Sequence, residues 1–331
     1  MKYLSLAVSI LVAALLSACG GGGSSSGSSK PAATVSITAS NADQVAKSAM
    51  TANSSAQTGT TTANTAKAAG MVADGSNPQS AMNFAINRFF ETQNLTFPAS
   101  NTTKAVSGYP KTYNCSTSGT YQVDITDADN SGTFTVGDSA VYTYTDCVAG
   151  TVTTKGSFSL KVNSYSSPSV PTSSNPESVS ATLTYNNLSV ATAKDTVTFN
   201  GDMTLSFTYD GTTVSASLSG SSYTVSSVNA GSVTFSNFSF KGSVNATTWT
   251  SSVDLTIKVT PTGGTEGTIN ISTPTAFSGA KGGNPTSGQM KIEGANGTYI
   301  IITANADGVH ADIEIYDGTT KTTKQLTWDQ L

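Results

Sequence analysis

The sequence has few charged residues and few of the side chains on which enzyme active sites commonly depend. Charged residues make up 11% of the chain, less than half of the roughly 25% that is usual for a soluble protein. The net charge of −4 disfavours a nucleic-acid partner, because no basic field is present to neutralise phosphates. The single histidine, His310, excludes a zinc site with several histidines and leaves only one candidate base for a Ser–His–Asp triad.

The one long hydrophobic run lies at the amino terminus. It extends from Leu4 to Leu15 after a basic Lys2 and is short for a permanent transmembrane helix, so it predicts a removable signal peptide of residues 1–18. The run ends in Leu16-Ser17-Ala18-Cys19, which resembles the lipobox of bacterial lipoproteins. This resemblance implies that Cys19 becomes the first mature residue and carries a diacylglycerol and an amide-linked acyl group such as palmitate. An ordinary secretory signal with an unrelated cysteine is the alternative.

Residues 19–31 form a predicted lipidated cysteine and linker. Several acyl chains hold a protein stably at a membrane, whereas one chain binds only marginally. The segment GGGGSSSGSSKP that follows Cys19 has no side chains able to pack, and a random coil of this length spans roughly 20 Å. By analogy with Gram-negative sorting, Gly20 in place of an aspartate favours the outer membrane, with the periplasmic and surface sides both open.

The remaining two cysteines, Cys115 and Cys147, are separated by 32 positions. An exported protein is in an oxidising compartment, where an even number of remaining cysteines predicts a disulfide. Two separate buried thiols are the alternative. A catalytic thiol is disfavoured, because neither cysteine has a basic neighbour in the sequence.

A pattern of calcium-ligand type lies between these cysteines. Residues 127–138 match the EF-hand loop at positions 1, 3, 5, 7 and 12, with a glycine at the turn position. The candidate ligands are Asp127, Asp129, Ser131, the backbone carbonyl of Thr133, and Asp138. Strand-forming residues flank the loop in place of amphipathic helices, so we expect a structural calcium site with a Kd of about 10⁻⁴–10⁻³ M. An Asp- and Gly-rich hairpin that binds no metal is the alternative.

The pattern of apolar residues predicts a mainly β (α+β) fold. Residues 32–110 form a helical and low-complexity region, with helices expected after Ser40-x-x-Asp43 and after Asn77-Pro78. Residues 111–331 alternate apolar and polar positions and contain many turn dipeptides. We therefore expect an antiparallel meander that forms a curved sheet, a sandwich or a half-barrel, with one or two amino-terminal helices packed on it.

A faint internal repeat runs through the β region. LTYNNLSV at residues 183–190 is similar to VTFSNFSF at residues 233–240, and glycines with polar neighbours recur at Gly156, Gly201, Gly242 and Gly288. Their spacing fits a unit of two long strands. The dipeptide Asn200-Gly201 suits either a tight turn or a bulge within a longer strand.

These features together resemble a group of uncharacterised proteobacterial β-rich lipoproteins. The resemblance rests on the lipobox, on the acidic loop bracketed by two cysteines, and on a carboxyl-terminal region from Pro285-Thr-Ser-Gly288 to Leu326-Thr-Trp328. It covers most of the mature chain, and the group has no assigned activity.

Two kinds of function remain open. The first is a non-catalytic, membrane-anchored module that binds a glycan, a lipid or a protein, with ring surfaces at Tyr142, Tyr144, Tyr223 and Trp249 unless these residues form the core. The alternative is an exported hydrolase such as a glycosidase with paired carboxylates. Asp312, Glu314 and His310 share one face of a predicted strand, a pattern that is also typical of a solvated face. We favour the non-catalytic module and assign no catalytic residue.

Overall fold

The computed structural model describes residues 30–47, 49–50, 106–107, 110–132, 134–166, 170–193, 195–229, 231–260 and 266–331. The chain divides into two compact units. One contains residues 61–218 and 223–229 and is called here the β3–β8 unit; the other contains residues 1–60, 219–222 and 230–331 and is called the β9–β15 unit. The predicted signal peptide, Cys19 and the helix expected after Asn77 lie outside the described residues.

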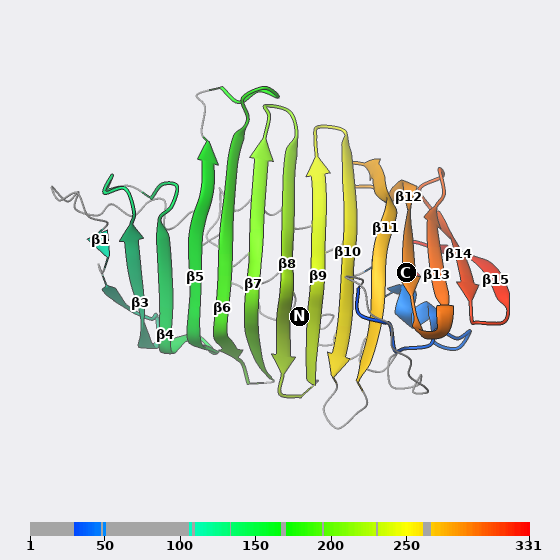
Figure 1. Cartoon of the computed structure of the whole chain (residues 1–331), viewed down its shortest axis with the longest axis horizontal. Helices are drawn as coiled ribbons and strands as arrows, with labels where there is room; N and C mark the ends of the chain where they lie inside the picture. The colour runs from blue at the N-terminus through cyan, green and yellow to red at the C-terminus, as the bar shows by residue number, and fades with distance from the viewer. Residues whose placement is uncertain are drawn as a thin grey trace. The chain divides into compact units, whose positions relative to one another are not determined.

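The β3–β8 unit is an antiparallel meander in which each long strand pairs with the next one along the chain (Figure 1). The two short strands at its start both pair with β3. Its strands are β1 (Val106–Ser107), β2 (Lys111–Asn114), β3 (Ser118–Asp127), β4 (Ser139–Ala149), β5 (Val152–Ser166), β6 (Glu177–Ala191), β7 (Thr196–Tyr209) and β8 (Val214–Ser227).

The β9–β15 unit repeats this topology (Figure 1). Each of its strands pairs in antiparallel fashion with its neighbour in the sequence. Its elements are β9 (Gly231–Val244), β10 (Thr248–Thr260), β11 (Gly267–Ala280), β12 (Pro285–Glu293), the 3₁₀ turn η1 (Ala295–Gly297), β13 (Tyr299–Ala304), β14 (His310–Tyr316) and β15 (Lys321–Thr327). The predicted antiparallel meander is thus confirmed, whereas these pairings do not confirm a sandwich or a half-barrel.

Alternation of buried and exposed residues gives most of the long strands one apolar face. In β5, Phe158, Leu160 and Val162 are buried, whereas Ser159 is partly exposed and Lys161 is exposed. In β13, Ile300 and Ile302 are buried and alternate with partly exposed residues. A fully buried side chain of this size contributes about 1.5–3 kcal/mol relative to an exposed one, so these faces account for much of the stability.

In some strands two residues, and not one, lie between two buried residues. A bulge of a single residue at these points keeps both buried side chains on the same face of the strand. In β6, Tyr185 and Leu188 are both buried, and the register shifts between them. Asn187 at this bulge has a φ of 50°, and Asn237 at the corresponding point of the sequence repeat has a φ of 47°. The repeat therefore has a physical basis, because asparagine tolerates the left-handed conformation that the bulge requires.

Two of the four glycines of the repeat, Gly156 and Gly201, lie beside the bulge at Asn187. Gly156 in β5 faces Tyr144 on β4, and Gly201 in β7 faces Tyr185 on β6. Asn200-Gly201 is thus internal to β7, which confirms the bulge interpretation over the tight turn. At Gly156, whose φ is +89°, an added Cβ would lie 2.0 Å from the carbonyl oxygen of Asn187.

The described amino-terminal residues form a stretch without helix or strand, residues 30–38, and a short helix that begins at residue 42. The helix buries Ala42, Val45, Ala46 and Ala49, the i, i+3, i+4 and i+7 positions of one face. Its start differs from the predicted capping box, because the Ser40 hydroxyl bonds to the Thr38 hydroxyl and Asp43 pairs with Lys324. The Asn41 side chain instead accepts a bond from the Thr38 amide at 2.9 Å. Within the described part of the chain, no helix has the length and hydrophobicity needed to cross a membrane.

We expect Gly156→Ala to lower the free energy of unfolding by more than about 3 kcal/mol, because the new methyl group overlaps a backbone carbonyl that cannot move without breaking the bulge. Gly150→Ala is the matched control. Gly150 also has a positive φ, +61°, but nothing lies within 4 Å of its added Cβ, so only the backbone strain of about 1 kcal/mol remains. Urea denaturation checks the difference, and equal effects of the two substitutions would contradict the bulge argument.

Candidate functional site

The acidic loop joins β3 to β4, so the predicted strand–loop–strand setting is confirmed. Carboxylate oxygens of Asp127, Asp129 and Asp138 all lie within 4.8 Å of one another. Asp127 is the last residue of β3, and Asp138 immediately precedes β4. The two strand ends therefore bring together three of the five predicted ligands.

Backbone amides hold the two inner carboxylates in place. Asp127 accepts hydrogen bonds from the amides of Ser131, at 3.2 Å, and Gly132, at 2.9 Å. Asp138 accepts hydrogen bonds from the amides of Ala128, at 2.7 Å, and Thr135, at 2.6 Å. Asp127 is 2% exposed and Asp138 is 0% exposed. Gly132 has a φ of 74°, which agrees with the sharp turn predicted at this position.

Asp129 lies on the exposed side of the cluster. Hydrogen bonds from the hydroxyls of Ser131 and Thr135 hold the pKa of Asp129 below its usual value. Ser131, predicted as a ligand, is exposed, and its hydroxyl hydrogen-bonds to Asp129. Thr133, the other predicted ligand, lies outside the described residues.

Thr135 is a member of the cluster that the sequence analysis did not assign. Its hydroxyl donates to Asp129 at 2.8 Å and lies 3.2 Å from Asp138. It occupies position 9 of the EF-hand pattern, where a ligand often acts through water, and this spacing was the signal for it. In the described part of the chain no lysine or arginine forms a salt bridge with the three aspartates. Convergent carboxylates without a basic partner are the ligand set that a hard cation such as calcium prefers.

The disulfide between Cys115 and Cys147 is present, with a Cα–Cα distance of 5.4 Å. It lies at the end of the β3–β4 hairpin where Ser118 pairs with Val148. The acidic loop is at the other end, beyond the pair Thr126 and Ser139. The hairpin is therefore constrained covalently at one end and by carboxylate–amide bonds at the other.

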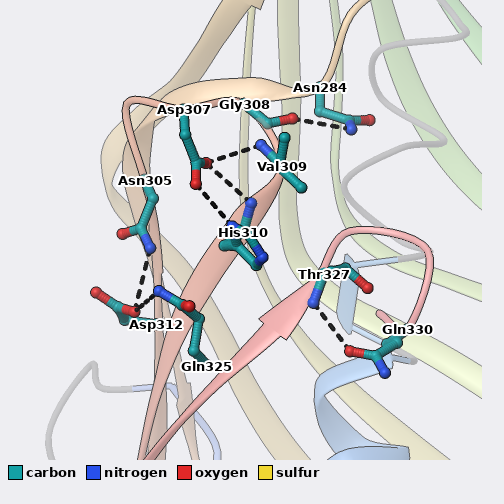
Figure 2. Close-up of polar contacts among 10 residues, drawn as sticks. All are labelled: Asn284, Asn305, Asp307, Gly308, Val309, His310, Asp312, Gln325, Thr327 and Gln330. Atoms are coloured by element: carbon teal, nitrogen blue, oxygen red, sulfur yellow. Dashed lines mark hydrogen bonds and ion pairs between the residues drawn. The ribbon is translucent and has the colours of Figure 1, made fainter.

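His310 lies at the start of β14, beside the turn that follows β13. Figure 2 shows that the Asp307 carboxylate is hydrogen-bonded to Nδ1 of the His310 ring and to two backbone amides. The distances to the carboxylate oxygens are 2.7 Å from His310 Nδ1, 2.8 Å from the Val309 amide and 3.0 Å from the His310 amide. These bonds, with the His310 side chain first, lower the pKa of Asp307 to about 2.

The carboxylates that share a strand face with His310 each have partners of their own. Asp312 accepts hydrogen bonds from Asn305 and Gln325, both at 3.2 Å (Figure 2). Glu314 accepts a bond from the hydroxyl of Tyr299 at 3.0 Å and pairs with Lys321 at 2.9 Å. The predicted common face is confirmed, and the side-chain partners describe a solvated, hydrogen-bonded strand surface.

The aromatic residues considered as ring surfaces belong to the core. Tyr142, Tyr144, Tyr223 and Trp249 are all buried. Tyr142, for example, packs with its ring centroid 6.2 Å from that of Phe158. The structure therefore places these four rings in the core and not on a binding surface.

No protein-family model matches the chain, and the comparisons with characterised proteins and with solved structures also give no match. The residues and their geometry are thus the basis for the functional argument that follows.

The Asp307 turn gives a pH prediction. Its folded pKa of about 2 is below the usual 3.8, so the carboxylate contributes stability above about pH 4 and loses this contribution as the pH falls through about 2. We expect His310→Ala to raise the pKa of Asp307 towards 3.8, measured by NMR titration of the carboxyl carbon. Gln325→Ala, which removes a partner of Asp312, should leave the Asp307 pKa unchanged. An Asp307 pKa that stays near 2 in His310→Ala would contradict the assigned cause.

Proposed function

We propose that the chain is a non-catalytic lipoprotein of the bacterial outer membrane, anchored through lipid on Cys19, which acts as a binding or structural module. The observation that carries this proposal is the pairing of Cys115 with Cys147. This disulfide uses two of the three cysteines in the chain. The third is Cys19, which lies at the lipobox-like position. A disulfide of this kind persists in the oxidising compartments that exported proteins reach.

The acidic loop is proposed as a structural calcium site. Three carboxylates that converge without a basic partner repel one another, and a bound divalent cation would offset that repulsion. The cation would be held by Asp127, Asp129 and Asp138. Because the loop connects two strands, binding would stiffen the β3–β4 hairpin rather than open a groove for a target.

The geometry around His310 gives less support to the hydrolase alternative. A glycosidase requires one carboxyl group as acid and a second as base or nucleophile across a cleft. Asp312 and Glu314 are instead engaged by neighbouring side chains on the solvent face of β14. The partner of the module, whether a glycan, a lipid or a protein, stays open.

Lipidation is tested by metabolic labelling with radioactive palmitate. We expect Cys19→Ala to abolish incorporation, because the thiol and the new amino terminus that receive the acyl groups are lost together. The double variant Cys115→Ser/Cys147→Ser is the matched control and should retain the label. Incorporation that persists in Cys19→Ala would refute the lipid anchor.

Calcium binding is tested by thermal unfolding with 10 mM calcium and with chelator. For a Kd of about 10⁻⁴–10⁻³ M, calcium at this concentration adds about 1.4–2.7 kcal/mol, or a rise in Tm of about 3–10 °C. Asp127→Ala should remove this difference. Asp317→Ala is the control, since Asp317 also accepts two backbone amide bonds but lies in a turn outside the cluster. The same Tm with calcium and with chelator in the wild-type protein would exclude the site.

A further inference from the structure

Within the β9–β15 unit, residues 30–38 lie against β11 and η1 through backbone hydrogen bonds (blue in Figure 1). The amides of Thr34 and Val35 donate to the carbonyl of Thr268 in β11, at 2.9 and 3.2 Å. On the other side, the amide of Ala295 in η1 donates to the carbonyl of Val35 at 2.7 Å. The segment is thus bonded on both sides to parts of the chain more than 200 positions away.

Buried polar side chains of the β9–β15 unit complete these bonds. Thr298 accepts from the amide of Ile37 at 2.9 Å, and Asn270 donates to the carbonyl of Pro31 at 3.0 Å. Behind Asn270, the hydroxyl of Thr256 donates to its side-chain oxygen at 2.5 Å. Without residues 30–38, the polar atoms that face them would lose these partners.

This contact uses most of the buried polar residues in the described part of the chain. Eight polar or charged residues are buried there, and five of them lie in or beside residues 30–41. Asn270 and Thr298 bond to this segment through their side chains, and Thr268 bonds to it through its backbone. Thr256 bonds to Asn270, and Asn41 bonds within the segment. Burial of a polar group costs free energy unless it is hydrogen-bonded. The surface is therefore suited to a specific peptide backbone and would be unfavourable when bare.

The contact is also close-packed. An added Cβ at Gly294 would lie 2.6 Å from the carbonyl oxygen of Val35 and 2.9 Å from Cγ1 of Ile37. The φ of Gly294 is −103°, a value that any residue adopts, so the glycine is required by its neighbours and not by its own backbone. These neighbours are Val35 and Ile37 of the passing segment and Thr298, whose Oγ1 would lie 2.5 Å from the added Cβ. Val35 and Ile37 are buried, which adds apolar contact to the polar bonds.

Ion pairs lie at both ends of residues 30–50. Lys30 pairs with Asp254 in β10, and Asp43 in the helix pairs with Lys324 in β15. Between these ends, the sequence Thr34–Thr38 is TVSIT, in which hydroxyl residues alternate with two buried β-branched residues. The surface therefore fits a peptide of this pattern followed by a short helix.

The unit that contains these contacts is discontinuous in the sequence. Residues 1–60 belong to it together with residues 219–222 and 230–331, and the β3–β8 unit is inserted between them. We infer that residues 30–50 form a separable docking segment, which binds the surface around Asn270, Gly294 and Thr298 tightly enough to stay bound after the chain beyond it is cut. This inference concerns an interaction surface and does not depend on lipidation.

The test uses the full-length chain with a site-specific protease sequence inserted in the Ser- and Thr-rich stretch of residues 54–66. After cleavage in detergent, the amino-terminal piece and the remaining chain are separated by size-exclusion chromatography. We expect the two pieces of the wild-type protein to co-elute. An excess of a synthetic peptide with the sequence of residues 30–50 should displace the amino-terminal piece.

Three variants identify the surface that holds the piece. Ile37→Asp places a charge in the buried contact and should weaken retention at least tenfold. Ala39→Asp, which adds the same charge at an exposed position two residues further on, should leave retention unchanged. Gly294→Ala changes the opposite side of the contact and should also release the piece. Because this glycine is in the β body, Ile37→Asp keeps the test valid if Gly294→Ala does not fold.

Two outcomes would overturn the inference. In the first, the wild-type pieces separate as readily as those of Ile37→Asp, which would mean that the docked segment is held only by the covalent chain. In the second, the pieces of Ile37→Asp stay together as firmly as those of Ala39→Asp, which would mean that other contacts hold them. Co-elution of the wild-type and Ala39→Asp pieces, with release in Ile37→Asp, supports the docking surface described above.

Discussion

The requirement that every long strand keep one apolar face away from water governs both units. Each strand pairs with its sequence neighbour, so a change of phase in one strand would turn its apolar residues towards solvent. The chain meets this requirement over segments of up to 15 residues, longer than the usual strand. Bulges at Asn187 and Asn237 restore the phase at points where two polar residues separate two apolar ones. Glycines at neighbouring positions leave room for the displaced backbone.

Hydrogen bonding to the backbone is the second recurring principle. With charged side chains at only 11% of the sequence, the chain relies on Asp, Asn, Ser and Thr side chains that bond to nearby amides. The acidic loop, the Asp307 turn and the docked amino-terminal segment all use this chemistry. The acidic loop differs from the other two in bringing three carboxylates together. That difference is the reason for proposing a cation at this loop and not at the other turns.

Much of this structure follows from the sequence, because alternation and turn chemistry are local. Alternation of apolar and polar neighbours predicts the strand that contains Phe158, and the dipeptide Asp210-Gly211 predicts a turn. The disulfide also follows, since only two cysteines remain once Cys19 is set aside. The bounds of β15 are harder to predict from the sequence, because KTTKQLT carries only one apolar residue and the strand is recognised by its pairing with β14. The alternation in β11 is also weak, and Pro274 lies at a register shift between β11 and β12.

The docked segment could not be predicted from patterns of neighbouring residues. Thr256, Asn270 and Thr298 have the composition of a solvated strand face, and their burial depends on a segment more than 200 positions away. The helix start shows the same limit on a smaller scale. Ser40 and Asp43 fit a capping box, but Asp43 pairs with Lys324, and Asn41 forms the bonds at the helix start. Thr135 was missed because a hydroxyl residue at that spacing is common in loops that bind nothing.

We propose that the protein is exported and attached by lipid at its first mature residue, and that one disulfide closes the β3–β4 hairpin. The most direct measurement is the intact mass of the protein extracted from the membranes of the organism that makes it, with thiol alkylation before and after reduction. The predicted result is a chain of residues 19–331 that carries acyl groups, takes up no alkylating reagent as isolated, and takes up two equivalents after reduction. A chain that begins at Met1, carries no lipid and is alkylated at all three cysteines without reduction would contradict the account.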